Sequence, residues 1–204
     1  MYGIGINDAD YIVFAQINGT RVMCPYYRAW KCMIVRCYNQ KFQNRYHTYK
    51  ECSTTKDWLI FSNFKDWMKT QDWQGKELDK DILTVGNKEY SPEACVFVSG
   101  DINKLLGDNA ESRGEYPQGV CWHKRAGKFM AQCSVSGDTK YLGCFNTITE
   151  AEIEYLEFKV GLIKKVAGEE EANGNQNLKA GLLRHADIFK IKINEHKKRI
   201  ARSC

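Results

Sequence analysis

The sequence lacks several features that would assign it to common protein classes. No run approaches the ~18 apolar residues of a membrane-spanning helix, which excludes an integral membrane protein of the helical kind. Residues 1–10 show no basic segment followed by an apolar stretch, so we expect no secretory signal and a cytoplasmic location. No internal repeat is visible, and no two cysteines have the Cys-x-x-Cys spacing typical of many zinc sites.

What is present indicates a folded chain of modest size. The 204 residues are 43% hydrophobic, enough for one compact domain or two small ones. Nine cysteines with no sign of export favour reduced thiols that act as small buried apolar side chains. The alternative is a structural Zn²⁺ site, for which the candidate ligands are Cys24, Cys37, Cys52 and Cys95.

The net charge of +5 is concentrated at one end of the chain. Residues 184–204 carry seven Lys and Arg against two Asp and Glu, while the remaining residues carry 23 of each sign. A basic end on a neutral body favours contact with a polyanion. A solvated helix face would have the same composition, so charge alone does not separate the two interpretations.

The first third of the chain predicts a short strand at residues 11–14, a turn at Asn18-Gly19 and two helices. Apolar residues recur at helical spacing over 25–38, and aromatic residues stand three apart over 58–68. We expect these aromatic side chains to pack as a core layer beneath the segment that follows. They are Trp58, Phe61, Phe64, Trp67 and Trp73.

Residues 78–106 predict a strand, a connection, a second strand and a short helix. The first strand ends near Asp79, Gly86-Asn87 supplies a turn, and residues 90–99 form the return strand. Residues 100–106 form the helix, with Asp101 near its N-terminus, where a carboxylate suits the helix dipole. This segment contains no histidine, and of the four in the chain only His47 belongs to the same predicted domain.

This segment resembles the ββα-metal, or HNH, endonuclease superfamily, in particular the HNH homing endonucleases of bacteriophages. The residues that carry the resemblance are Leu78–Asp81, Gly86–Lys88, Tyr90–Glu93, Cys95, Phe97, Val98 and Asn103. A preceding set also matches: Cys24–Tyr27, Trp30, Arg36–Tyr38, Tyr49, Cys52, Trp58 and Phe61–Phe64. The resemblance covers residues 24–106, and a phage-encoded chain would act in the cytoplasm of the host cell.

The resemblance implies phosphodiester hydrolysis with one Mg²⁺, held by Asp79 and Asn103. Family members usually have a histidine as general base beside the metal-binding Asp, and Lys80 stands at that position here. A lysine of ordinary pKa is protonated at neutral pH and is a poor base. Either its pKa is lowered, or Lys80 acts only as a cation and Tyr90 assists it, as in relatives that pair a basic residue with a tyrosine. The alternative from the residues alone is that Asp79 caps a turn and Asn103 bonds a loop.

Residues 107–118 are polar and read as a linker, after which a second unit begins. Strands are predicted at 119–124, 129–135 and 140–145, joined by turns. Thr147 and Glu150 form a capping-box pattern that opens a helix reaching about residue 166. Residues 168–177 are polar and predict a loop, and residues 178–202 predict a final basic helix.

The second unit resembles the AP2 DNA-binding domain, through Val120, Gly127, Phe129, Ala131, Leu142, Gly143, Phe145, Glu150 and Ala151. That resemblance implies a three-stranded sheet that lies in the major groove. Residues 119–146 carry four Lys and Arg against one Asp, which fits DNA on the sheet side. The predicted DNA contacts are His123, Lys124, Arg125, Lys128, Gln132, Lys140 and Tyr141. The alternative is that these are solvated strand residues.

Together these patterns predict an α+β protein: a nuclease domain at 1–106, a linker at 107–118, a DNA-binding domain at 119–166 and a basic tail at 167–204. The first consists of a helical, aromatic layer with a ββα-metal finger, and the second of a three-stranded antiparallel sheet plus a helix. The predicted activity is Mg²⁺-dependent cleavage of double-stranded DNA. The alternatives are a DNA-binding protein without catalysis on the same scaffold, and a protein-binding inhibitor that reuses the fold.

Overall fold

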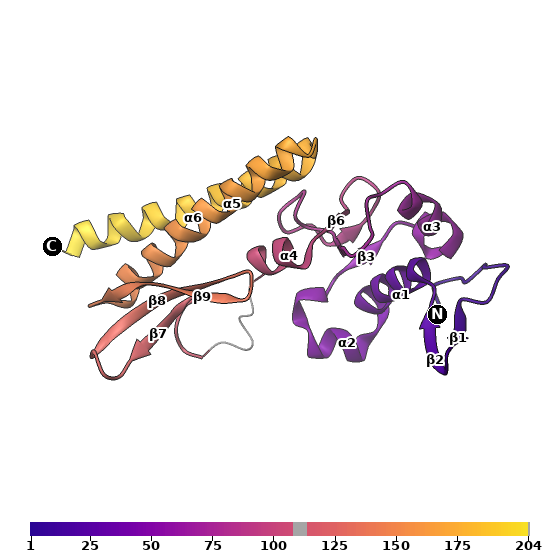
Figure 1. Ribbon diagram of the computed structural model, residues 1–204, viewed down its shortest axis with the longest axis horizontal. Helices are drawn as coiled ribbons and strands as arrows, with labels where there is room; N and C mark the ends of the chain where they lie inside the picture. The colour runs from indigo at the N-terminus through magenta and orange to yellow at the C-terminus, as the bar shows by residue number, and fades with distance from the viewer. Residues whose placement is uncertain (108–113, 204) are drawn as a thin grey trace. The chain divides into compact units, whose positions relative to one another are not determined.

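The structure, a computed structural model, describes residues 1–107 and 114–203, and the chain divides into two units, Met1–Ser99 and Gly100–Cys204. Helices and small sheets occur in both units, as expected for an α+β protein (Figure 1). Half of the predicted linker 107–118, residues 108–113, lies outside the described part of the chain. No helix among the described residues is both long enough and apolar enough to cross a membrane.

The first unit contains six short strands and a helical layer. Its strands are β1 (Phe14–Ile17), β2 (Thr20–Met23), β3 (Ser53–Thr54), β4 (Glu77–Asp79), β5 (Glu89–Tyr90) and β6 (Val96–Val98). Its helices are α1 (Pro25–Tyr38), α2 (Gln40–Arg45), η1 (His47–Tyr49), η2 (Asp57–Leu59) and α3 (Phe61–Lys69). The prediction for α1 is confirmed at both ends, and it starts on Pro25, which suits the first turn because its missing N–H would have no helical partner.

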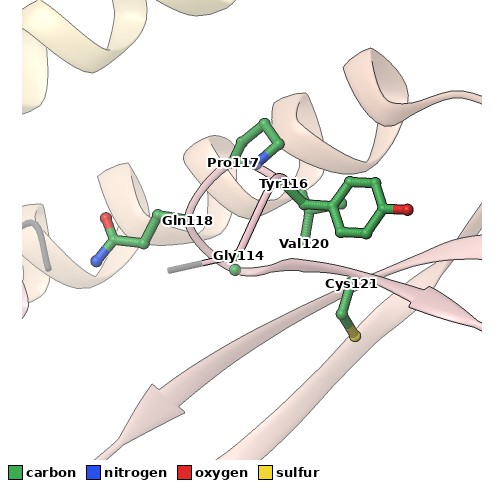
Figure 2. A pocket seen from close by; sticks show the side chains of 7 residues that line it. Gly114, Tyr116, Pro117, Gln118, Val120 and Cys121 are labelled. Carbon is green, nitrogen blue, oxygen red and sulfur yellow. The ribbon is translucent and has the colours of Figure 1, made fainter. Parts of the chain in front are cut away.

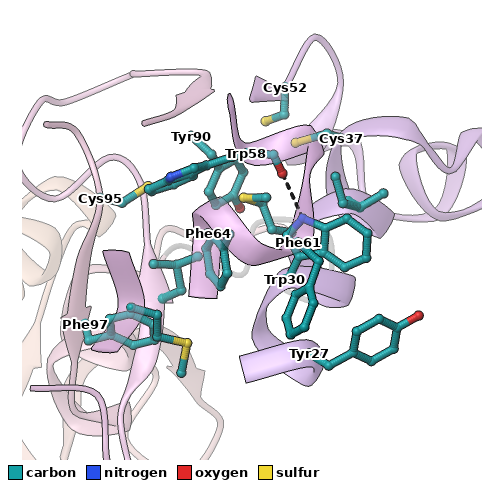
Figure 3. Close-up of a cluster of buried hydrophobic side chains, with 14 of the residues drawn as sticks. Tyr27, Trp30, Cys37, Cys52, Trp58, Phe61, Phe64, Tyr90, Cys95 and Phe97 are labelled. Carbon is teal, nitrogen blue, oxygen red and sulfur yellow. Dashed lines mark hydrogen bonds between the residues drawn. The ribbon is translucent and has the colours of Figure 1, made fainter. Parts of the chain in front are cut away.

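The aromatic layer of the first unit forms its core, as predicted. Trp30 and Phe64 are fully buried, and the Trp30 indole N–H donates to the Trp58 carbonyl at 2.7 Å (Figure 3). The Trp67 ring stacks on Phe97 of β6 with ring centroids 5.8 Å apart. Because the buried indole has its own acceptor, the tryptophans add apolar area without an unsatisfied donor.

Three predictions for the first unit are wrong in detail. The helix predicted over 58–68 is divided, because η2 ends at Leu59, Ile60 is extended and α3 begins at Phe61. Strand β1 begins at Phe14 rather than Tyr11, although the Asn18-Gly19 turn is confirmed and both residues have positive φ, as a type I′ hairpin requires. The predicted return strand at 90–99 is two separate strands: β5 pairs in parallel with β3, and β6 pairs antiparallel with β4. Pro92 interrupts the strand because it has no N–H for a ladder, and Ser91 accepts from the Cys95 N–H at 3.0 Å to close a turn.

The second unit contains α4 (Gly100–Leu106), β7 (Val120–His123), β8 (Lys128–Val135), β9 (Asp138–Phe145), α5 (Ile148–Ala172) and α6 (Gln176–Ser203). The three strands form one antiparallel sheet in the order β7-β8-β9, as predicted. Helix α5 packs on one face of this sheet, and α6 lies along α5 (Figure 1). Both bonds of the predicted capping box are present between Thr147 and Glu150.

The predicted loop at 168–177 is wrong, because α5 continues to Ala172 and α6 begins at Gln176. Residues 169–171 are three glutamates, which are good helix formers, and their polarity reflects exposure at the end of a helical hairpin. The turn itself uses Gly174 with φ +82°. Ion pairs along the hairpin, such as Lys197 with Glu157 at 2.6 Å, occupy part of the basic charge of α6.

Gly119 provides a test of how the sheet is anchored on α5. It has φ +79°, and an added Cβ would overlap the ring of Tyr155, which is itself buried on α5. We expect Gly119→Ala to lower the free energy of unfolding by about 3–5 kcal/mol, from left-handed strain plus overpacking. Gly127→Ala is the matched control, since Gly127 has φ +62° but open space around it. It should lose only about 1–2 kcal/mol. Equal losses in thermal unfolding would contradict the packing argument.

Candidate active site and nucleic-acid interface

Asp79 lies at the end of β4, opposite Val96 of β6, where the chain turns into a loop. Its Oδ1 accepts the backbone N–H groups of Asp81 and Ile82, both at 2.8 Å. A carboxylate that bonds the backbone two and three residues ahead fixes the start of the loop and its own orientation. This is the turn-capping role of the alternative interpretation.

The electrostatic environment of Asp79 is unfavourable to its charge. Burial, and then the neighbouring Asp81 carboxylate, raise the pKa of Asp79 to about 6, against the lowering effect of the two N–H donors. At neutral pH the group is therefore ionised at a cost in free energy. A bound cation would remove that cost, which makes the carboxylate a suitable metal ligand.

Lys80 has the surroundings of a structural residue. It is 6% exposed, and its ammonium donates to Asp81 Oδ2 at 3.0 Å and to the Asn87 carbonyl at 2.8 Å. Asn87 in turn donates to the Lys80 carbonyl at 2.7 Å. These bonds close the loop between β4 and β5. A side chain this buried and held by two hydrogen bonds does not reach a water or a substrate, so this geometry does not support a general-base role for Lys80.

Tyr90 is also a core residue, with 1% exposure. Burial raises the pKa of its hydroxyl, and the neighbouring Arg36 lowers it by a smaller amount. A hydroxyl this buried does not reach a substrate in this conformation, which is a correction to its predicted catalytic role. Arg36 was missed from the sequence: it also donates to the Leu78 carbonyl at 3.3 Å and so ties α1 to the strand that carries Asp79. The signal was an arginine on the otherwise apolar stripe of α1.

The other predicted metal ligand, Asn103, is half-buried on α4, and its carbonyl accepts the Gly107 N–H at 3.0 Å. The division of the chain assigns Asp79 to the first unit and Asn103 to the second. Their joint binding of Mg²⁺ therefore stays a prediction. His47 is exposed on η1, and the neighbouring Thr48 carbonyl accepts from Lys88 at 2.9 Å, which ties η1 to the end of the Asp79 loop.

The four cysteines proposed for zinc do not form a site. Among the described residues no three His, Cys, Asp or Glu side chains gather to hold a metal ion. All eight described cysteines are free. Cys37 and Cys95 are buried in the core, where burial raises the pKa of each thiol to about 12. Both thiols therefore pack as small apolar side chains in the core.

The sheet of the second unit has one face covered by α5 and one that α5 does not cover, here called the open face. Val120, Ala131 and Cys133 are buried toward α5, so the alternate residues point the other way. Cross-strand pairing aligns these residues as His123 with Lys128, Cys121 with Met130 and Cys144, Gln132 with Tyr141, and Ser134 with Thr139.

The open face carries most of the predicted DNA contacts. His123, Lys128, Gln132 and Tyr141 lie on it, and Tyr141 is 60% exposed. Lys124 and Arg125 are exposed in the adjoining β7–β8 turn. His123 Nδ1 accepts the Ala126 N–H at 3.1 Å, which leaves the ring proton on Nε2 as an outward donor. Among the described residues of this face no carboxylate occurs.

Lys140 is the exception and requires a correction. It pairs with the buried Cys133, and its ammonium lies 4.8 Å from the ring centroid of Phe158 on α5. Lys140 therefore points to the helix side and does not belong to the open face. Trp122 packs edge-on against Phe129 on that same side, with ring centroids 4.9 Å apart.

A cavity of about 410 Å³ opens beside the start of β7 (Figure 2). The described residues that line it include no carboxylate, histidine, lysine or arginine, and so supply no groups for acid–base or phosphate chemistry. We assign it no role in the proposed activity. Its lining residues are Gly114, Tyr116, Pro117, Gln118, Gly119, Val120 and Cys121.

Comparison of the chain with protein-family models, curated proteins and solved structures found no match. Any assignment of function therefore depends on the residues and geometry described above.

The raised pKa of Asp79 has a consequence for stability. Since the folded-state pKa of about 6 lies above the ordinary value of 3.8, the folded state holds the proton more tightly, and stability falls as pH rises through that window. Asp79→Asn removes the charge, while the amide oxygen still accepts both N–H groups. We expect it to raise the free energy of unfolding by about 1–3 kcal/mol at pH 7.5 in EDTA.

The gain should be much smaller at pH 4, as measured by thermal unfolding at both pH values. Asp72→Asn is the control, because the Asp72 side chain is 78% exposed and pairs only with Lys76 at the surface. A gain for Asp79→Asn that does not change with pH would contradict the argument from burial.

Proposed function

We propose that the chain is a Mg²⁺-dependent DNA endonuclease of the HNH homing type, directed to duplex DNA by an AP2-like second unit. The observation that carries the proposal is Asp79, a half-buried carboxylate with a raised pKa at the end of β4, the strand that pairs antiparallel with β6. Asp79 and Asn103 would hold the metal. A Mg²⁺ there would neutralise charge on the phosphate oxygens during hydrolysis.

The chain's own residues would prepare that carboxylate for binding. The Asp81 and Ile82 N–H groups fix its orientation, and Lys80 neutralises Asp81 and anchors the loop. Arg36 supports the strand from α1 through the Leu78 carbonyl. Neither Lys80 nor Tyr90 is assigned as the general base, because both are buried. Lys80 is hydrogen-bonded to Asp81 and Asn87, and Tyr90 to Arg36.

The open face and the β7–β8 turn support the DNA-binding part of the proposal. Their cationic and donor groups are not opposed by carboxylates in the described residues, as a surface that contacts phosphates requires. The second candidate is a DNA-binding protein without catalysis. The observation that favours it is that Lys80, at the position of the usual general base, is held by hydrogen bonds to Asp81 and Asn87 and does not act as a base.

The cleavage proposal is tested with the full chain and its source DNA, with and without Mg²⁺. We expect nicking or cleavage at a preferred site that needs Mg²⁺, and a loss of at least about 100-fold in rate for Asp79→Ala and for Asn103→Ala. DNA binding, measured in EDTA by gel shift, should be retained in both variants. Cleavage that persists unchanged in both would contradict the assigned ligands, and binding without turnover under any divalent ion would support the second candidate.

The same assay separates two roles for Lys80. Arginine can donate to Asp81 and Asn87 but is not deprotonated at accessible pH. Lys80→Arg should keep activity within roughly threefold if the residue is structural, and abolish it if the residue is the general base. A melting temperature near that of the parent protein shows that the loop has been kept.

The surface assignment predicts a contrast between two lysines of the same sheet. Lys128 lies on the open face, whereas Lys140 lies over Phe158 on the helix side. Lys128→Ala should lower the slope of log affinity against log salt by about 0.9, the loss of one phosphate contact. Lys140→Ala should leave that slope unchanged. Fluorescence anisotropy across 50–200 mM salt measures both, and a larger change for Lys140 would reverse the face assignment.

A further inference from the structure

The centre of the open face is apolar and rich in sulfur. Cys121, Met130 and Cys144 are direct cross-strand neighbours on β7, β8 and β9, so their side chains form one row across the sheet. All three are half-buried. We call them the sulfur row. Two thiols and a thioether offer no strong hydrogen-bond donor, so the row is suited to contact with a small apolar group rather than with a phosphate.

Two polar side chains flank the sulfur row on one side. Gln132 and Tyr141 are cross-strand partners, one step along β8 and β9 from Met130 and Cys144, across a bulge between Ala131 and Gln132. A side-chain hydrogen bond with Cys144 raises the pKa of the Tyr141 hydroxyl. The Gln132 amide offers one acceptor and two donors in a plane, the arrangement that pairs with the N7 and N6 edge of adenine.

The cationic groups lie toward the opposite end of the face. His123 pairs with Lys128 next to the β7–β8 turn, where Lys124 and Arg125 are exposed. No guanidinium or ammonium group stands in the sulfur row or beside Gln132, and those are the groups that most often read guanine. Three adjacent strands span roughly 10 Å, which fits a major groove about 12 Å wide. The basic end suits the phosphates, and the apolar centre then meets base edges.

We propose that the open face reads an A·T-containing step in the major groove, with the sulfur row against a thymine C5-methyl group and Gln132 paired with adenine. This inference rests on the proposed DNA binding and adds the base composition that the second unit selects. The thymine methyl is the apolar feature of that groove, and it matches the apolar row. Met130, at the middle of the row, is the specificity-determining residue for the methyl group.

The test begins with selection of duplexes from a random library by the full chain in EDTA. Enrichment of A·T pairs at the protected centre is expected. In the best duplex, each central thymine is then replaced by deoxyuridine, which removes only the methyl group. We expect a loss of roughly fourfold in affinity per contacted methyl, the equivalent of about 0.8 kcal/mol.

Variants place the effect on named residues. Met130→Ala should make the thymine and deoxyuridine duplexes bind equally, and Met130→Leu should keep most of the difference. Ser134→Ala is the matched control on the same face, away from the row, and should keep all of it. Gln132→Ala should relax the preference for adenine at one position while leaving the sensitivity to the methyl group in place, which gives a second readout if Met130→Ala is poorly folded.

The outcomes separate the inference from the proposal beneath it. Binding to duplexes with a G·C centre, or equal affinity for thymine and deoxyuridine in the parent protein, overturns the inference and leaves DNA binding and cleavage intact. Failure to bind any duplex overturns the proposed DNA binding itself. A fourfold preference for thymine that Met130→Ala abolishes and Ser134→Ala retains supports the inference.

Discussion

The arrangement of residues around Asp79 depends on the partial burial of its carboxylate. A carboxylate with two backbone donors is adequately hydrogen-bonded, yet burial and Asp81 still raise its pKa to about 6. The surrounding residues act on this one group: Lys80 balances Asp81, and Arg36 holds the strand by the Leu78 carbonyl. An anion whose charge the fold disfavours lowers stability, and the proposed cation would remove that cost.

The same network explains why the basic residue beside Asp79 need not be a base. In the expected chemistry a neighbour of the metal ligand accepts a proton, and that requires an accessible, weakly paired side chain. Lys80 has the opposite properties, with 6% exposure and two bonds that hold the loop. In this chain Lys80 therefore stabilises the loop between β4 and β5. If hydrolysis occurs, the proton acceptor comes from elsewhere, and the exposed His47 lies on the segment that Lys88 ties to the loop.

Local sequence signals were enough for elements with a strong internal pattern. Helix α1, the three-stranded sheet and the capping box of α5 all follow from residue spacing or cap chemistry within a few positions. The break between β5 and β6 and the extension of α5 to Ala172 did not follow, because each depends on tertiary pairing or packing. Polar residues 169–171 fit a loop or a helix end equally well, and only the partner helix α6 decides between them.

The face assignment of Lys140 and Tyr141 shows what spacing can and cannot determine for a site. Adjacent residues of a strand point to opposite faces, so the two predicted contacts, Lys140 and Tyr141, could not both lie on one surface. Which of them lies on the open face depends on the alternation along β9, and the bulge between Ala131 and Gln132 shifts that alternation midway along the sheet. The shift carries Tyr141 to the open face beside Gln132, and it directs Lys140 to Phe158. The bulge thereby puts a planar amide and a phenol next to the sulfur row and keeps a cation out of the part of the face where bases would be read.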